Sequence, residues 1–110
     1  QSIIARKNHI LGIEGIEGTN ELIKRCGKYY NQQMNEKNEF GPVLIKLPKR
    51  NQTLDLDMPV IGFDTIKLAY KYNFFGIGFS KKGVLVVNEN EIRSFCKNEN
   101  FYIHCIGDKD

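Results

Sequence analysis

The hydrophobic and polar positions at the start of the chain alternate with the period of strands. Two short β-type runs, Ser2–Arg6 and Ile10–Glu14, are separated by polar residues, a pattern that predicts a β-hairpin. The apolar run Pro42–Leu47 predicts a buried strand, Pro48–Gln52 a basic turn, and the alternation in Thr53–Asp57 a half-buried strand. The first half of the chain is therefore expected to contribute most of a sheet.

The second half repeats this pattern. Phe75–Phe79 and Val84–Val87 flank a Lys-Lys-Gly segment and predict a second hairpin. Phe101–Ile106 is an apolar run near the end of the chain and predicts a closing strand. Between the predicted strands, Met58–Gly62 contains a proline and a glycine and is expected to be an irregular loop.

A first helix is predicted after the glycines of the N-terminal region. Thr19 is a suitable N-cap for Asn20–Cys26, and Gly27 is the expected stop. The following segment, Lys28–Glu39, is rich in Asn, Gln and Lys and lacks a continued apolar face. We expect it to be a long surface loop.

Two more helices are predicted farther along the chain. Asp64 or Thr65 can cap a helix that runs to about Asn73. The acidic segment Asn88–Glu91 resembles a capping box and opens a helix to about Asn98. Their inward stripes are expected to be Ile66, Ala69 and Tyr70 in the first and Ile92, Phe95 and Cys96 in the second.

Three helices interleaved with several short strands predict a layered α/β or α+β domain with a mixed sheet. The 110 residues suffice for one hydrophobic core, so residues 1–110 are expected to form a single domain. The chain starts at Gln1 in an apolar run, which is typical of a fragment of a longer protein. Residues that complete a site are then expected on the missing part of the longer protein.

Composition narrows the function classes. The net charge of +3 is small and scattered, which argues against a nucleic-acid partner. The three cysteines, Cys26, Cys96 and Cys105, have neither disulfide-framework nor metal-site spacing, so buried free thiols in a reducing, cytoplasmic compartment are expected. No segment has the composition of a signal peptide or the length of a membrane span.

The segment Gly12–Asn20 carries the most suggestive chemistry. Glu14 and Glu17 lie three residues apart between a strand end and a helix start, with glycines beside them. Glycine allows a ligand to approach the backbone, and a helix N-terminus suits a phosphate. Carboxylates there favour a cation site, although a solvated β–α turn with helix-favouring acids explains the same pattern.

Two other candidate sites flank the predicted turn Pro48–Gln52, with the acids after it and a lysine before it. Asp55 and Asp57 stand before an irregular apolar loop, a place for a site acid or for solubilising edge residues. Lys46 lies in an apolar strand, where it either extends from an edge or lines a pocket, and Lys49 and Arg50 follow it. Together these cations could serve a phosphorylated ligand.

The order of these segments resembles one family. Gly12–Asn20 (GIEGIEGTN), Val43–Lys46 with Lys49 and Gln52, and Leu54–Gly62 (LDLDMPVIG) with Thr65 are similar to the C-terminal domain of the LpxI-type UDP-2,3-diacylglucosamine pyrophosphatases. These enzymes act in the lipid A pathway of some Gram-negative bacteria. The similarity covers nearly the whole chain, and the EaIEGTD-like and D-[LM]-P-x-I-G segments are specific in combination.

The resemblance implies a reaction and a ligand set. The substrate would be UDP-2,3-diacylglucosamine, cleaved at its pyrophosphate to UMP and lipid X with a divalent cation, magnesium, at the inner face of the cytoplasmic membrane. The family enzyme has two domains with the site between them. A homodimer is one option that the sequence leaves open.

Residue roles follow from the same resemblance. Asp57 is expected to be the most critical acid, and Lys46 to stabilise charge. Glu17, with the helix start at Gly18 and Thr19, is expected to form the phosphate and cation cradle. The full predicted set is Asp57, Glu17 and Lys46 for catalysis; Gly18, Thr19, Lys49, Gln52 and Thr65 for phosphate or substrate; and Asp57, Glu14 and Glu17 for the metal.

Two departures from the family pattern stand out. Asn20 occupies a position where the family usually has an aspartate, and Arg50-Asn51 replaces the usual Pro-Gly. The acid at position 20 is then dispensable, or this site binds its cation differently. The rival hypothesis is a non-catalytic module that binds a nucleotide sugar or phospholipid, or that dimerises, and needs no metal.

Overall fold

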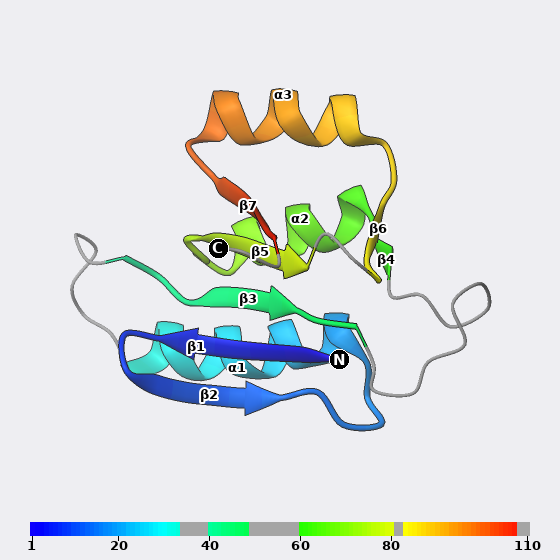
Figure 1. Cartoon of the computed structure of the whole chain (residues 1–110). Helices are drawn as coiled ribbons and strands as arrows, with labels where there is room; N and C mark the ends of the chain where they lie inside the picture. Colours follow the sequence, from blue (N-terminus) through cyan, green and yellow to red (C-terminus); the bar gives the residue numbers. More distant parts are fainter. Residues whose placement is uncertain (34–39, 49–59, 81–82, 108–110) are drawn as a thin grey trace.

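The computed structural model describes residues 1–33, 40–48, 60–80 and 83–107 and contains strands and helices in alternation (Figure 1). The elements are β1 (Ser2–Arg6), β2 (His9–Ile13), α1 (Thr19–Gln33), β3 (Val43–Lys46), β4 (Val60–Ile61), α2 (Phe63–Lys71), β5 (Gly76–Ser80), β6 (Leu85–Val86), α3 (Glu89–Glu99) and β7 (Tyr102–Ile106). The predicted strand Thr53–Asp57 and most of the predicted turn Pro48–Gln52 lie outside the described residues.

The main sheet has five strands in the order β2-β1-β3-β5-β7. Strand β1 is antiparallel to both of its neighbours, while β3, β5 and β7 are mutually parallel. A separate two-stranded parallel sheet joins β4 to β6. The predicted mixed sheet with three helices is therefore confirmed as a compact α+β fold, and so is the first hairpin.

The three helices pack on the same face of the main sheet. Three crossovers, β2–α1–β3, β3–α2–β5 and β5–α3–β7, each join strands that point the same way, and right-handed crossovers advancing in one direction place their helices on one face. Strand residues of the core alternate toward these helices, and Ile4, Leu44 and Ile77 are all at most 2% exposed. The core is thus a single layer between sheet and helices.

This topology gathers chain ends at one edge of the sheet. The carboxyl ends of β2, β3, β5 and β7 lie there, and the register Ser2↔Lys46 places the start of β1 beside the end of β3. Helix α1 follows β2 at this edge, and α2 and α3 begin at the same edge after the short strands β4 and β6 (Figure 1). In open α/β sheets ligands bind outside the carboxyl ends of the strands.

Helix α1 is twice as long as its sequence predicts. Gly27 does not stop the helix but lies buried inside it, and Lys28–Gln33 are helical rather than a loop, while residues 34–39 lie outside the described part. The reason is tertiary. A Cβ at position 27 would lie 2.6 Å from Cγ of Tyr72, so the glycine permits close packing at the end of α2.

The predicted second hairpin is wrong. Strand β5 is buried between β3 and β7, and β6 pairs with β4 instead. The residues predicted as an irregular loop, Met58–Gly62, contain β4 at Val60–Ile61. Local alternation would pair β5 with β6, the next strand along the chain. In the structure each of these strands instead pairs in parallel with strands that are distant in sequence.

The predicted helix caps are also wrong in detail. Helix α2 begins at Phe63 after Gly62, so Asp64 and Thr65 fall inside its first turn. Asn88 precedes α3 in a left-handed conformation (φ 56°) and makes no side-chain cap hydrogen bond. The capping box therefore does not form, although the predicted helix and the closing strand do.

Side-chain burial follows the predictions with two exceptions. Cys26 and Cys96 are buried, but Cys105 is exposed because it lies near the end of the edge strand β7. Tyr70 packs edge-on against Phe95 yet is 40% exposed, since its hydroxyl extends to Glu99 at 2.9 Å.

Candidate active site at the carboxyl edge of the sheet

Four polar side chains from four different elements meet at the carboxyl edge of the sheet. Ser2 comes from the first residue of β1, Glu14 follows β2, Thr19 begins α1, and Lys46 ends β3. The backbone holds them in place, because Glu14 N donates to Ser2 O at 2.8 Å. We call these residues the Ser2–Glu14–Thr19–Lys46 cluster.

The Thr19 hydroxyl is the centre of the cluster. It donates to Glu14 Oε1 at 2.7 Å and accepts from Lys46 Nζ at 3.0 Å. The Ser2 hydroxyl lies 3.1 Å from the same oxygen. Because the Thr19 proton goes to Glu14, the Ser2 proton is free to go to Thr19 or to the carboxylate. Thr19, the predicted N-cap, thus directs its hydroxyl to Glu14 and Lys46, and it is the first residue of the helix.

Lys46 occupies an unusual position for a lysine. It ends a strand in the middle of the sheet, between β1 and β5, and is only 9% exposed. The alternation of β3 turns Leu44 and Lys46 toward the helices, so the ammonium group reaches the start of α1. The sequence allowed Lys46 to extend from an edge strand or to line a pocket. Strand β3 is not an edge strand, so the first alternative is excluded, and the side chain extends into the cluster.

Glu14 is held in its ionised form. Partial burial alone would raise its pKa, but hydrogen bonds from Thr19 and Ser2 and the positive charge of Lys46 outweigh this effect and lower the pKa. A carboxylate paired in this way stays negative at neutral pH. The cluster therefore presents an anion and a cation on opposite sides of one hydroxyl.

The turn into α1 depends on Gly18. Its φ of +86° lies in the left-handed region, which a residue with a Cβ rarely adopts. Its carbonyl accepts from Leu22 N at 3.1 Å in the first turn of the helix. Gly18 thus sets the direction in which Thr19 leaves the loop and enters the cluster.

Glu17, the second predicted carboxylate, has a different partner. It forms an ion pair with Arg25 of α1, with Nη2 and Oε1 2.9 Å apart. The hydrogen bond from Arg25 lowers the pKa of Glu17, and the same bond raises the pKa of Arg25. The two carboxylates therefore have separate partners, Thr19 for Glu14 and Arg25 for Glu17.

Asn20 connects the first two helices at the same edge. Its Oδ1 accepts a hydrogen bond from the Thr65 hydroxyl in the first turn of α2 at 3.0 Å. Thr65, predicted to bind substrate, therefore lies beside the start of α1. The side chain of Asn20 is a neutral amide, so it adds no charge at this edge.

Three predicted site residues, Asp57, Lys49 and Gln52, lie outside the described residues. Within residues 1–33, 40–48, 60–80 and 83–107, no group of three His, Cys, Asp or Glu side chains could hold a metal ion. The same ranges contain no helix long and apolar enough to cross a membrane. The assignment of Asp57 and the metal remain predictions.

Sequence reasoning missed Ser2. Its side chain is fully buried and touches Thr19, although it is polar and stands at the first position of a strand. The available signal was the alternation of β1, which places Ser2 on the same face as the core residue Ile4. A serine on the buried face of a strand needs a hydrogen-bonding partner.

Comparison with known proteins gives one family. The family model "LpxI C-terminal domain" matches residues 1–104. No curated protein matches the chain.

Proposed function

The chain belongs to the LpxI C-terminal domain family, and we propose that it forms one half of an active site that hydrolyses the pyrophosphate of UDP-2,3-diacylglucosamine. The family places the chain among hydrolase-type proteins of lipid A biosynthesis. The proposed products are UMP and 2,3-diacylglucosamine 1-phosphate, lipid X. The other half of the site would come from an N-terminal domain of the longer family protein.

The observation that carries the proposal is the Ser2–Glu14–Thr19–Lys46 cluster. It brings an ionised carboxylate, a buried ammonium and two hydroxyls together outside the carboxyl ends of the sheet. A diphosphate repels an attacking water through its charge, so its hydrolysis needs cationic stabilisation and an oriented nucleophile. Lys46 of the cluster can supply the cationic stabilisation.

Each group has a place in the proposed reaction. Lys46 and the helix start at Gly18–Thr19 stabilise negative charge on the phosphates. The oxygen of the attacking water bonds to one phosphorus of the diphosphate while Asp57 accepts a proton from that water. The bond from this phosphorus to the bridging oxygen breaks, and the other phosphate leaves with the bridging oxygen. Thr65, Lys49 and Gln52 are proposed to contact the substrate, with Thr65 beside the start of α1 through Asn20.

The proposed cofactor is a divalent cation. Magnesium takes oxygen ligands and commonly uses one or two carboxylates together with substrate phosphates. The donor chemistry fits, because Glu14 is an ionised carboxylate and the hydroxyls around it are oxygen donors. Glu14 and Asp57 would hold the ion, joined by Glu17 if substrate displaces Arg25. The bound ion would add positive charge at the phosphates.

The protein context is also part of the proposal. A diacylated sugar nucleotide resides at a membrane, so we propose contact with the inner face of the cytoplasmic membrane without spanning it. Homodimer formation would not be needed for the chemistry described above. The essential partner is the N-terminal domain.

UMP release from UDP-2,3-diacylglucosamine by the full-length protein tests this function, with and without chelator. We expect metal-dependent release that Asp57→Ala abolishes while the circular dichroism spectrum is unchanged. Near-wild-type activity of Asp57→Ala would refute the assignment of Asp57. Substrate binding without any UMP release would instead favour the non-catalytic binding module.

The chain without its partner domain should show little or no turnover. The cluster contains one carboxylate and one ammonium, and a large part of the substrate contacts is proposed on another domain. Activity of the 110-residue chain equal to that of the full-length protein would contradict this division of the site.

A further inference from the structure

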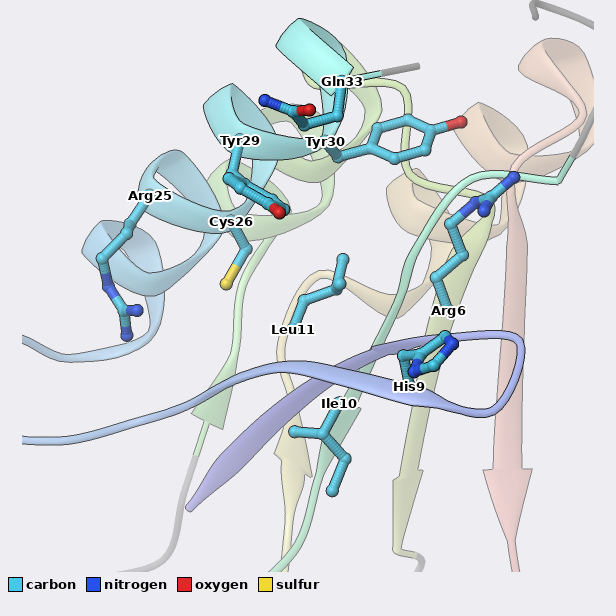
Figure 2. A pocket seen from close by; sticks show the side chains of 9 residues that line it. All are labelled: Arg6, His9, Ile10, Leu11, Arg25, Cys26, Tyr29, Tyr30 and Gln33. Carbon is cyan, nitrogen blue, oxygen red and sulfur yellow. The ribbon is translucent and has the colours of Figure 1, made fainter.

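A cavity of about 580 Å³ lies between helix α1 and strand β2, away from the cluster described above (Figure 2). One wall is the face of α1 from Arg25 to Gln33, and the other is the hairpin of β1 and β2. Neither Glu14 nor Lys46 lines it. Its volume falls within the range of about 300–1,000 Å³ that small-molecule sites occupy.

The cavity exists because α1 approaches β2 closely only near Gly12 and lies farther from the hairpin toward Gln33. A Cβ at Gly12 would lie 2.6 Å from Sγ of Cys26, so the glycine brings the helix down onto the strand there. Figure 2 shows the space between helix and hairpin widening from Cys26 toward Gln33. The fold itself therefore leaves a wedge along the outer strand of the sheet.

A β-bulge directs an apolar side chain into this wedge. The pairing of β1 with β2 passes from Ile4↔Gly12 to Ala5↔Ile10, which leaves Leu11 as an extra residue. Its side chain points up toward α1 in Figure 2, opposite to the neighbouring Ile10. Leu11 and the buried Cys26 give the cavity an apolar interior.

The polar groups of the cavity are basic or neutral. Arg6, His9 and Arg25 line it, and no carboxylate does among the described residues. Arg25 has its counterion in Glu17. Arg6 is positioned at the hairpin end, where its Nε donates to the Phe40 carbonyl at 3.1 Å. Its guanidinium carbon lies 5.3 Å from the centre of the Tyr30 ring.

We propose that this cavity binds a single-chain anionic amphiphile. The apolar chain would lie against Leu11 and Cys26, and its carboxylate or phosphate group would meet Arg6 and His9 at the hairpin end. A guanidinium held by its neighbours makes a favourable partner for either anion, because little further ordering is needed on binding. The proposal is independent of the hydrolase function, because it uses none of the proposed catalytic groups.

Binding is tested with the chain itself and four decyl compounds below their aggregation concentrations. Decanoate and decyl phosphate are the anions, decyl glucoside is the neutral control, and decyltrimethylammonium is the cation. Isothermal titration gives the affinities, and amide chemical-shift changes locate the site. We expect saturable binding of an anion, with shifts in residues 6–12 and 25–33, and no such binding of the cation. Comparison of the two anions identifies the preferred headgroup.

Two substitutions test the position of the headgroup. Arg6→Gln and His9→Gln should each weaken binding of the preferred anion, the former by about tenfold, the effect of one charge-assisted hydrogen bond. The matched control is Arg93→Gln on α3, where the arginine is exposed and pairs with Glu89. His9 is exposed in the hairpin, so His9→Gln remains informative even if Arg6→Gln perturbs the contact with Phe40.

Four results would overturn the proposal. The first is equal affinity for the cationic and anionic compounds, and the second is chemical-shift changes that lie outside the cavity. The third is the absence of saturable binding for both anions. Inorganic phosphate serves as a further probe, and binding as tight as that of decyl phosphate would remove the role of the apolar chain.

Discussion

Thr19 is the single hydroxyl through which the carboxyl edge of the sheet is held together, and its replacement by valine tests this arrangement. Valine keeps the shape of threonine and removes the oxygen that donates to Glu14 and accepts from Lys46. Hydrogen bonds to charged groups contribute about 1.5–3 kcal/mol each. Since the cluster is only partly buried, each bond should lie near the lower end, so we expect a loss of about 2–4 kcal/mol.

The matched control is Thr19→Ser, which keeps the hydroxyl and removes only a methyl group. It should cost about 1 kcal/mol or less, because the two charge-assisted bonds remain. Urea unfolding followed by far-ultraviolet circular dichroism measures both values, since the chain has no tryptophan for fluorescence. In addition, the pKa of Glu14, followed by NMR of its carboxyl carbon, should rise in Thr19→Val and stay low in Thr19→Ser.

Three outcomes would contradict this reasoning. If Thr19→Val is as stable as the original chain, the hydroxyl bonds add nothing to folding. If Thr19→Ser loses as much stability as Thr19→Val, the methyl group and its packing explain the effect. An unchanged pKa of Glu14 in Thr19→Val would show that Ser2 and Lys46 alone keep the carboxylate ionised.

Three further predictions concern the same fold. The pKa of Glu14 is lowered in the folded state, so its stabilising contribution is present above the ordinary carboxyl pKa and is lost as pH falls through the lowered value. The free energy of unfolding, measured in urea from pH 7 to pH 3, should therefore depend less on pH in Glu14→Gln than in the original chain. Gly27→Ala should destabilise the chain by about 1–3 kcal/mol in urea unfolding, because its Cβ would meet the Tyr72 ring, whereas Ser94→Ala on the exposed face of α3 should change stability by less than about 0.5 kcal/mol. Asn20→Asp adds a negative charge at the proposed cation site, so it should tighten magnesium binding to the full-length protein in calorimetry, and a weaker affinity would contradict the proposed placement of the ion.

The sequence by itself determined the parts that depend on short-range patterns. The first hairpin, the buried strand β3, the helix α3 and the closing strand β7 all follow from local periodicity and turn residues. Periodicity alone left Glu14 and Lys46 open to a purely structural interpretation, and only the family resemblance assigned Glu14, Thr19 and Lys46, with Glu17 and Asp57, to one site. In the structure Glu14 and Lys46 meet through Thr19, a contact that the sequence analysis did not predict, and the catalytic roles of these residues stay predictions.

Only the tertiary structure decided which partners these elements take. Gly27 is compatible with a helix end or with a helix pressed against another, and the Tyr72 ring selects the second. Strand β5 alternates as a hairpin strand would, yet parallel pairing with β3 and β7 buries it in the middle of the sheet. Ser2 joined the site because the register of β1 with β3 places it beside Lys46. Periodicity records which face of a segment is buried, whereas pairing across the sheet depends on residues far apart in the chain.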